Sequence, residues 1–406
     1  MIGEKFSRRT FLAAAMALPL ASVVSGAARP RIIVVGAGAF GGWTALHLLR
    51  KGASVTLIDA WGPGNSRASS GGETRVIRGV YGPVSTYVKW TVRSLQLWRE
   101  SEQAWNRKLY FKTGALWMIH DDDAYEKAAL PLLKAEGLSY EILNPEEASR
   151  RYPQINWDGV RWALREEEAG YLLARQACQS VLEAFIREGG EYRQSWVTIN
   201  GIHSNVLAGI RTSDGSSLQA DQYVFACGPW LSRIFPDMPG PLIQPTRQEV
   251  FFFGTPAGDV RFTDSALPVW VDHGERLIYG IPGNERRGFK VADDTRGEPF
   301  DPTSGERIVS SEKLVAIRKF LAHRFPELKD APVVESRVCQ YENSQDQHFI
   351  FDRHPEAQNA WIAGGGSGHG FKHGPAIGEY VAGLVLDSNK PDPFFQLSRF
   401  ATEIVK

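Results

Sequence analysis

The sequence predicts an α/β fold of two domains. Separate stretches of the chain are expected to build one parallel sheet, and the segments between them to build a second, mixed-sheet α+β domain. Three observations carry this expectation. The chain has 406 residues, more than a single hydrophobic core usually supports. A glycine-rich turn joins an apolar strand to a helix soon after residue 30, and later apolar strands indicate returns of the chain to the same sheet.

Composition and motifs exclude several classes of partner. The 46 Lys and Arg residues balance 46 Asp and Glu residues, so nothing in the net charge favours nucleic acid or an anionic membrane surface. Three cysteines do not make a disulfide framework, and the chain has neither an HExxH nor a C-x-x-C motif. We therefore expect a small-molecule partner, with no nucleic acid and no bound metal.

Residues 1–28 have the pattern of an export signal. Arg8 and Arg9 in "SRRTFL" precede an apolar run over 11–24, and small residues follow at 25–28. The run is shorter than the ~20 residues of a comfortable membrane span. A twin-arginine pair is typical of proteins that the twin-arginine translocase exports in the folded state, and a general secretion signal is the alternative. The expected location is periplasmic or secreted, without stable membrane insertion.

A dinucleotide site is predicted at the start of the remaining chain. Gly36, Gly38 and Gly41 have G-x-G-x-x-G spacing between an apolar strand and a helix that ends near Lys51. Such glycines allow a tight turn, close approach of the backbone to a pyrophosphate, and close packing of helix on strand. Asp59 ends the next strand, where a carboxylate can bind ribose hydroxyls. This pattern indicates a Rossmann-like domain and does not by itself decide between FAD and NAD.

Later segments are expected to complete this domain. They are a helix over 173–187, a strand near 192–198, a hairpin around "TSDGSS", a buried strand in "ADQYVFACGPW", a strand from about 360, and a helix over about 375–387. The first domain is therefore expected to be discontinuous. Its predicted parts are 30–115, 165–240 and 333–395, and the second domain is predicted to comprise 116–164 and 241–332.

Three blocks of sequence resemble the monomeric sarcosine oxidases and N-methyl amino acid oxidases, within the D-amino-acid-oxidase-like flavoproteins. They are "SSGGETRVIRGVYG" at 69–82, "YGIPGNERRGFK" at 279–290, and the region from "VCQYENSQDQHFIFDRHP" through "GGGSGHGFKHGP". The resemblance implies a Rossmann-like FAD-binding domain with a separate substrate domain. It also implies hydride transfer from an amine substrate to the flavin N5, hydrolysis of the imine, and reduction of molecular oxygen to hydrogen peroxide.

The resemblance assigns cofactor residues. It implies that FAD is covalently attached, through its 8α-methyl group, to a cysteine matching Cys339, the one cysteine in a polar stretch. This chemistry requires a thiolate near positive charge, and Arg337 lies two residues away. An unreactive thiol is the alternative. Ser69, Thr74 and Gly368, in the matched blocks, are expected to contact FAD. A fixed flavin would also survive export.

Two matched cations point to the substrate. Arg78 and Lys372 match the carboxylate ligands of the family, and guanidinium and ammonium groups bind carboxylates by paired hydrogen bonds and as a point charge, respectively. The resemblance therefore implies a secondary or primary α-amino acid. Tyr341 matches a pocket residue, and Trp270 is expected to help shape the substrate cavity.

Four further residues are expected at the reacting centre. Lys290 matches a lysine that promotes the reaction of reduced flavin with oxygen, since a fixed cation stabilises the negative charge that develops. Arg75 matches an arginine that steadies the reduced ring, and Tyr279 and His369 are expected in the pocket wall.

Two departures from the family pattern argue against sarcosine itself as the substrate. Gly71 and Asp294 stand where the sarcosine enzymes often have histidine. Two other functions stay open: an exported dehydrogenase that passes electrons to a quinone or another carrier, which Lys290 argues against, and a non-catalytic flavoprotein.

Overall fold

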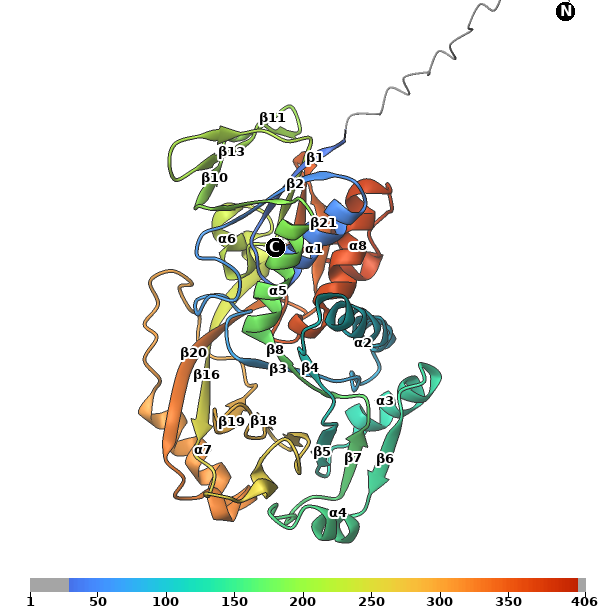
Figure 1. The fold of residues 1–406 in the computed structure, drawn as a ribbon, viewed down its shortest axis with the longest axis vertical. Helices are drawn as coiled ribbons and strands as arrows, with labels where there is room; N and C mark the ends of the chain where they lie inside the picture. Colours follow the sequence, from blue (N-terminus) through green and yellow to red (C-terminus); the bar gives the residue numbers. More distant parts are fainter. Residues whose placement is uncertain (1–28, 401–406) are drawn as a thin grey trace, which may run out of the picture.

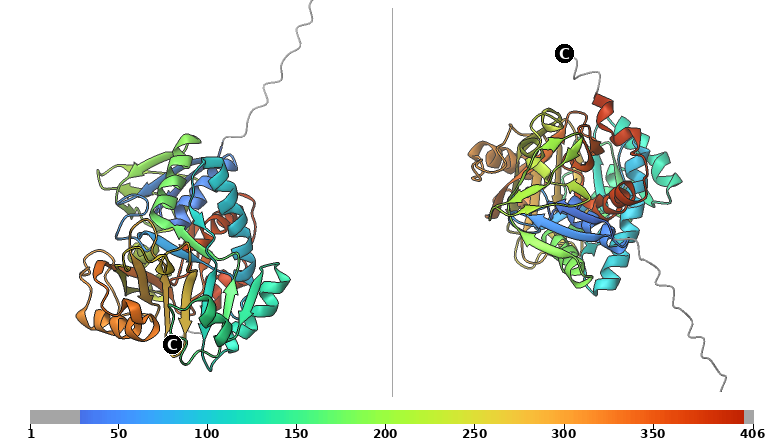
Figure 2. Two further views of the ribbon diagram at one scale, coloured as in Figure 1. Left: turned by 60° about the horizontal axis from the view of Figure 1, so that its bottom comes forward. Right: turned by 90° about the horizontal axis from the view of Figure 1, so that it is seen from above.

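The structure, a computed structural model, describes residues 29–400. The predicted export signal at 1–28 lies outside the described residues. The chain forms two parts, one above the other in Figure 1, and crosses between them several times. In the left view of Figure 2, the first sheet lies in the upper part and the gold and orange segments of the second sheet lie below it. No helix within 29–400 is long and apolar enough to cross a membrane.

A six-stranded sheet organises the first domain, in the order β21-β22-β15-β1-β2-β9. All neighbours pair in parallel except β21 and β22, which are antiparallel. The strands are β1 (Arg31–Val35), β2 (Ser54–Asp59), β9 (Glu191–Gln194), β15 (Gln222–Phe225), β21 (Ile350–His354) and β22 (Ala357–Gly364). The predicted returns of the chain to one sheet are therefore confirmed.

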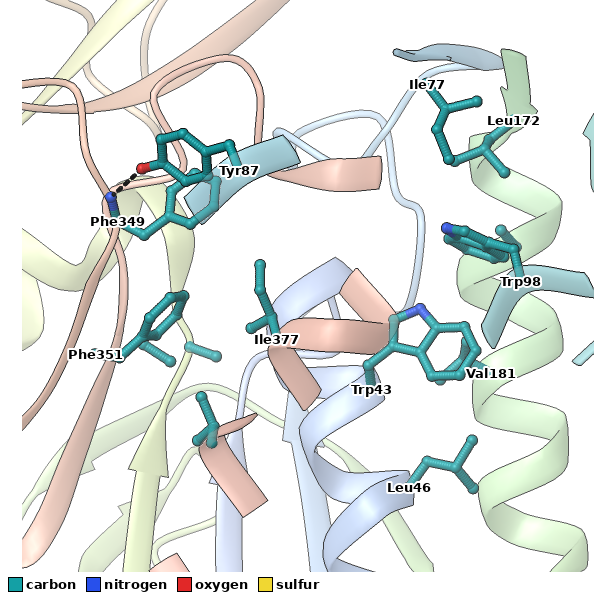
Figure 3. Close-up of a cluster of buried hydrophobic side chains, with 14 of the residues drawn as sticks. Trp43, Leu46, Ile77, Tyr87, Trp98, Leu172, Val181, Phe349, Phe351 and Ile377 are labelled. Atoms are coloured by element: carbon teal, nitrogen blue, oxygen red, sulfur yellow. Dashed lines mark hydrogen bonds between the residues drawn. The ribbon is translucent and has the colours of Figure 1, made fainter. Parts of the chain in front are cut away.

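Four helices pack around this sheet. They are α1 (Ala39–Arg50), α2 (Ser85–Trp105), α5 (Ala174–Arg187) and α8 (Gly374–Leu386). Trp43 of α1 lies at their centre, with its ring 5.2 Å from that of Trp98 on α2, and Figure 3 shows both rings in the buried cluster with Ile377 of α8. A side chain on Gly378 would collide with the Trp43 backbone, so glycine at this position lets α8 lie directly against α1.

An eight-stranded mixed sheet forms the second domain, in the order β20-β16-β19-β18-β17-β5-β7-β6. Only β17 and β5 pair in parallel. The strands are β5 (Ala115–Ile119), β6 (Tyr140–Leu143), β7 (Trp162–Glu166), β16 (Ile243–Phe253), β17 (Val269–His273), β18 (Leu277–Ile281), β19 (Phe289–Asp293) and β20 (Val333–Ser344). Helices α3 (Ala124–Ala135), α4 (Pro145–Arg151) and α7 (Ser311–Arg324) complete this domain. The expected mixed sheet is present.

Smaller elements join these parts. A three-stranded sheet contains β3 (Thr74–Ile77), β4 (Tyr110–Phe111) and β8 (Gly170–Leu173). At the far end of the first domain lie β10 (Val197–Ile199), β11 (Ile202–His203), β12 (Val206–Leu207), β13 (Ile210–Thr212) and β14 (Ser217–Leu218). The short helix α6 (Leu231–Ile234) lies nearer the second sheet and contacts β16. The hairpin expected around "TSDGSS" is the turn between β13 and β14.

One predicted domain boundary needs correction. The division at residue 333 assigns β20 to the first domain, but β20 pairs with β16 from Ile243↔Ser344 to Phe253↔Val333. Strand β20 is therefore an edge of the second sheet, and the first sheet resumes only at β21. The carboxyl end of β20 reaches toward the first domain, as Figure 1 shows.

Candidate functional site

Two adjoining cavities lie where the domains meet. The larger has a volume of about 420 Å³ and follows the glycine-rich turn after β1. The smaller has a volume of about 60 Å³ and lies toward the second sheet. Arg75, Gly368 and Phe371 line both. A long molecule in the larger cavity would therefore present one end to the smaller one.

The predicted glycine fingerprint forms one wall of the larger cavity. A Cβ on Gly36 would collide with the carbonyl oxygen of Ala226, and one on Gly41 with the carbonyl oxygen of Gly36. Both positions therefore require glycine so that β1, α1 and β15 can approach closely. Gly38 caps the N-terminus of α1 and lines the cavity, which gives a phosphate access to backbone N–H groups and to the positive end of the helix dipole.

Asp59 lies at the expected ribose position in this cavity. Its carboxylate accepts hydrogen bonds from the backbone N–H groups of Ala37 at 2.8 Å, Trp61 at 2.9 Å and Gly62 at 2.7 Å. Burial raises the pKa of Asp59, while these N–H groups oppose the rise. The three bonds tie the turn after β1 to the turn after β2, and they leave part of the carboxylate's accepting capacity for a ligand.

Three tryptophans line the same cavity together with Asp59. The Trp61 ring lies 4.4 Å from that of Trp196 and 4.8 Å from that of Trp230, and the Trp230 indole N–H donates to Thr303 Oγ1 at 2.9 Å. Sequence reasoning missed this cluster, because its members come from three distant segments. The one available signal was the position of Trp61, two residues after the predicted ribose ligand. Aromatic rings here can stack on a nucleobase.

Two buried hydroxyl groups near the larger cavity have no hydrogen-bond partner among the described residues. They are Ser69 Oγ, on a residue that lines the cavity, and Thr74 Oγ1. Such orphaned groups are unusual and suit a polar ligand. Gly368, with φ +82°, packs against the Tyr341 ring where a Cβ would collide, so this position requires glycine.

Glu342, which sequence reasoning also missed, holds the glycine-rich loop after β22. Its carboxylate accepts the Gly366 N–H at 3.0 Å and its carbonyl accepts the Ser367 N–H at 3.0 Å. Burial raises the pKa of Glu342 to about 7, while the N–H groups of the loop oppose the rise. The carboxylate also lines the larger cavity and thereby fixes the loop that both cavities share.

Cys339, on β20, contacts Arg75, which lines both cavities. Its sulfur is 3.6 Å from Arg75 Nη2, and the same nitrogen donates to the carbonyls of Ser69 at 2.7 Å and Gly71 at 2.9 Å. Arg337, the cation expected near the sulfur, instead pairs with Glu73 at 2.9 Å and with Glu335. The cation in contact with the thiol is therefore Arg75, and Cys339 itself is half-buried.

The two predicted carboxylate ligands line the smaller cavity together. Arg78 lies over the Tyr81 ring, with Cζ 4.6 Å from its centroid, and donates to the Val80 carbonyl. Lys372 donates from Nζ to the Tyr81 hydroxyl at 2.8 Å and to the His369 carbonyl at 3.0 Å. Although the two cations are far apart in sequence, Tyr81 brings them to one place. Sequence reasoning did not select Tyr81.

The remaining wall of the smaller cavity holds a fourth basic residue, besides Arg75, Arg78 and Lys372, and a carboxylate. Lys290 Nζ donates to the Thr74 carbonyl at 2.9 Å, and burial, followed by the charge of Arg75, lowers the pKa of Lys290 to about 7. Tyr279 and His369 line the cavity as expected. Asp294 lines it too and accepts the Tyr341 hydroxyl at 2.8 Å, so the sequence departure at this position lies in the cavity wall.

Two residues predicted for the substrate pocket lie elsewhere: Tyr341 lines the larger cavity, and Trp270 lines neither. The Trp270 ring is fully buried on the opposite side of the second sheet, stacked 5.6 Å from Phe289 and 5.8 Å from Phe320. Its neighbour Val271 lines the smaller cavity instead. The expectation is therefore corrected: successive residues of a strand face opposite sides, and Trp270 belongs to the core.

The fold and the two cavities define a two-domain protein with a dinucleotide site and a second, smaller site beside it. A family model described as FAD dependent oxidoreductase matches residues 31–384, and the chain belongs to this family. Its cofactor is FAD, which fits the glycine cradle, the aromatic end and the orphaned Ser69 and Thr74 hydroxyls.

Individual relatives agree with this assignment. Monomeric sarcosine oxidase of Bacillus sp. (strain B-0618) is 31% identical over 366 residues, which cover 87% of this chain and 92% of the relative. N-methyl-L-tryptophan oxidase of Salmonella heidelberg (strain SL476) is 27% identical, covering 91% and 99%. The solved L-proline dehydrogenase from P. horikoshii shares the fold, with a TM-score of 0.80 at 20% identity, covering 92% of this chain and 98% of the other.

Proposed function

We propose that the protein oxidises a secondary or primary α-amino acid at the bond between its α-carbon and nitrogen. The observation that carries this proposal is the convergence of Arg78 and Lys372 on a cavity that shares Arg75 and Gly368 with the FAD cavity. Bound FAD supplies the chemistry, since its ring accepts a hydride from the substrate carbon. The names of the relatives, sarcosine oxidase and N-methyl-L-tryptophan oxidase, support substrates of this class.

In this proposal the chain orients the substrate through its carboxylate. Arg78 offers paired N–H donors in a fixed plane and Lys372 offers a compact charge, so the two together define the direction of the amino acid. Tyr81 holds the two cations in place. The buried setting strengthens both interactions relative to water.

The substrate side chain is proposed to meet Asp294 and Tyr341. The Asp294 carboxylate is bound to the Tyr341 hydroxyl and lies 3.2 Å from Arg296 Nη1, so this wall is polar. A polar wall suits a side chain or N-substituent that carries a hydrogen-bond donor better than it suits sarcosine, whose α-carbon carries no side chain.

Molecular oxygen is the proposed electron acceptor, with hydrogen peroxide as its product. Support comes from Lys290, a buried lysine that lines the smaller cavity together with Arg75, because a fixed positive charge favours the build-up of negative charge on oxygen. We further propose that Cys339 carries the flavin covalently and that the twin-arginine signal exports the loaded protein. Substituting Arg8 and Arg9 with lysine should then leave active protein in the cytoplasm.

The decisive experiment compares an amino acid with its matching amine. A panel of primary and N-methyl amino acids is assayed for peroxide, and the best substrate is paired with the amine that lacks its carboxylate. Arg78→Ala should raise KM for the amino acid by roughly 10- to 100-fold, because a charge-assisted hydrogen bond contributes about 1.5–3 kcal/mol. KM for the matching amine should change little in the same variant. Arg161→Ala, at an exposed arginine, is the control.

The outcomes separate the competing functions. Equal losses for amine and amino acid would remove carboxylate recognition from Arg78. Anaerobic reduction of the flavin by a substrate, without fast peroxide formation in air, would indicate a dehydrogenase that uses another acceptor. If no member of the panel reduces the flavin, the proposal of an amino acid oxidase is wrong.

A further inference from the structure

Lys372 is buried without a counter-charge. The residue is only 4% exposed. Its Nζ has two hydrogen-bond partners, the Tyr81 hydroxyl and the His369 carbonyl, and both are uncharged. Within the part of the chain that the structure describes, no carboxylate lies within ion-pair distance of Nζ. A buried ammonium without an ion partner is costly, so these surroundings favour the uncharged amine while the cavity is empty.

The nearest acids are already engaged. Glu166 accepts the Trp117 indole N–H at 2.8 Å and the Gly79 N–H at 2.6 Å, and Asp294 is bound to Tyr341 and Arg296. The positive charge of Arg78, in the same cavity, opposes the attraction of these two carboxylates for a protonated Lys372. Burial is the largest effect and the Arg78 charge the second, and together they hold the pKa of Lys372 well below its ordinary value despite the two acids.

A buried hydrogen-bond chain lies behind Lys372. The Tyr81 hydroxyl contacts His373 Nε2 at 2.8 Å and His369 Nδ1 at 3.3 Å in addition to the lysine. Burial, the largest effect, holds the pKa values of both histidines well below their ordinary range and keeps them neutral, and the charge of Lys372, once it is protonated, acts in the same direction. Neutral His373 can accept a hydrogen bond from the Tyr81 hydroxyl, so the Tyr81 oxygen is free to accept a hydrogen bond from Lys372. The chain therefore stabilises a proton on Nζ without adding charge.

We infer that Lys372 accepts the proton that an amino acid substrate must lose before it can be oxidised. This inference rests on the proposed function. An α-amino acid arrives as an ammonium carboxylate, whereas hydride departs from a carbon whose nitrogen has a free electron pair. In the step, one N–H bond of the substrate breaks and one Nζ–H bond forms, with no change of oxidation state. The products are a neutral substrate amine and the Lys372 ammonium.

The same transfer creates the carboxylate site. Once protonated, Lys372 becomes the counter-ion of the substrate carboxylate, and Tyr81 and His369 satisfy two of its three N–H groups. One carbon separates the amine from the carboxylate, so a lysine in contact with the carboxylate is within reach of the amine directly or through one water. Binding and deprotonation of the substrate thus become a single event.

The test counts protons exchanged when the holoenzyme binds two probes. Acetate has a carboxylate and no amine. α-Aminoisobutyrate is a zwitterion without an α-hydrogen, so it cannot be oxidised. Binding heats measured at pH 8 in phosphate and in Tris give the number of protons exchanged with the buffer. The enzyme should take up about one proton from the buffer when it binds acetate. It should take up almost none when it binds α-aminoisobutyrate, because this probe supplies the proton from its own ammonium group.

Variants assign the proton to Lys372. Lys372→Met should abolish the uptake with acetate, whereas Tyr81→Phe, which removes one hydroxyl, should keep the fold and reduce the uptake at this pH. Lys112→Met, at an exposed lysine, is the control and should leave the acetate uptake unchanged. Acetate binding without proton uptake, or equal uptake with both probes, would overturn the inference and leave the proposed function standing. If neither probe binds, carboxylate recognition is wrong and both fall.

Discussion

Arg75 Nη2 lies 3.6 Å from Cys339 Sγ, although 264 positions separate the two residues in the sequence. The guanidinium belongs to β3 and lines both cavities, while the sulfur belongs to an edge strand of the second sheet. A fixed positive charge thus lies against the sulfur that we propose as the attachment point of the flavin. The contact also links the two domains at the place where the cavities meet.

The first prediction concerns this sulfur. Cys339→Ser should give folded protein that releases its flavin on acid precipitation, whereas the wild-type pellet should stay yellow. The substitution changes one atom on a half-buried strand, so the far-ultraviolet circular dichroism spectrum should be unchanged. Cys178→Ala, at a buried cysteine on α5, should keep a yellow pellet. A colourless wild-type pellet would refute covalent attachment.

The second prediction concerns Lys290. Lys290→Met should slow the reoxidation of reduced enzyme by oxygen on the order of 100-fold, as loss of a preorganised positive group does in other reactions. Because burial lowers the pKa of Lys290 to about 7, the lysine is cationic below that pH and neutral above it. The reoxidation rate of the wild type should therefore fall as the pH rises through about 7.

Stopped-flow absorbance after photoreduction measures this rate. Lys112→Met, at an exposed lysine, is the control. A variant that forms peroxide as fast as the wild type at every pH would show that Lys290 has no part in the oxygen reaction.

The third prediction concerns the tryptophan cluster. In a Cys339→Ser background, Trp61→Ala should raise the Kd for FAD about 5- to 100-fold, because base stacking contributes roughly 1–3 kcal/mol. The Kd for FMN, which lacks the adenosine, should not change. Trp61→Phe keeps an aromatic face, so its Kd for FAD should lie between those of Trp61 and Trp61→Ala proteins. Flavin fluorescence reports both affinities, and an equal loss for FAD and FMN would contradict stacking at this end.

The fourth prediction compares two adjacent glycines. Gly41→Ala should prevent flavin binding or folding, because the new Cβ would collide with the Gly36 carbonyl oxygen. Gly42→Ala meets its nearest atom, Val181 Cγ1, at 3.3 Å, where a side chain can adjust. This variant should keep its flavin and its melting temperature within a few degrees. If both variants behave alike, the close approach of α1 to β1 does not depend on Gly41.

Much of the cofactor side of the site was predictable, because its signals are local. The glycine spacing fixed the turn after β1, and Asp59 followed at the end of the next strand. The apolar strands around Tyr223 and Trp361 predicted the returns to one sheet, and both lie where expected. Resemblance supplied Arg78 and Lys372, which the fold brings into one cavity.

The remaining features depend on pairing between distant segments, which periodicity does not reveal. The choice of Trp270 over Val271 for the cavity failed because strand alternation permits either face, and the neighbours β5 and β18 decide which face meets the cofactor domain. Tyr81 precedes α2 and His373 precedes α8, and no sequence pattern links the two segments that bring them into contact. For the same reason the tryptophan cluster was invisible before its three segments were placed.

The order of strands in the first sheet has a consequence for biosynthesis. During translation β1 emerges early, but its neighbour β15 comes almost two hundred residues later, and β22 and Lys372 follow much later still. A nascent chain therefore exposes β15 as an unpaired edge until β22 has left the ribosome, and such edges invite aggregation. Gly366, Gly368 and Gly370 of the larger cavity also follow β22, so a chain that stops before β22 lacks part of the wall around the cofactor.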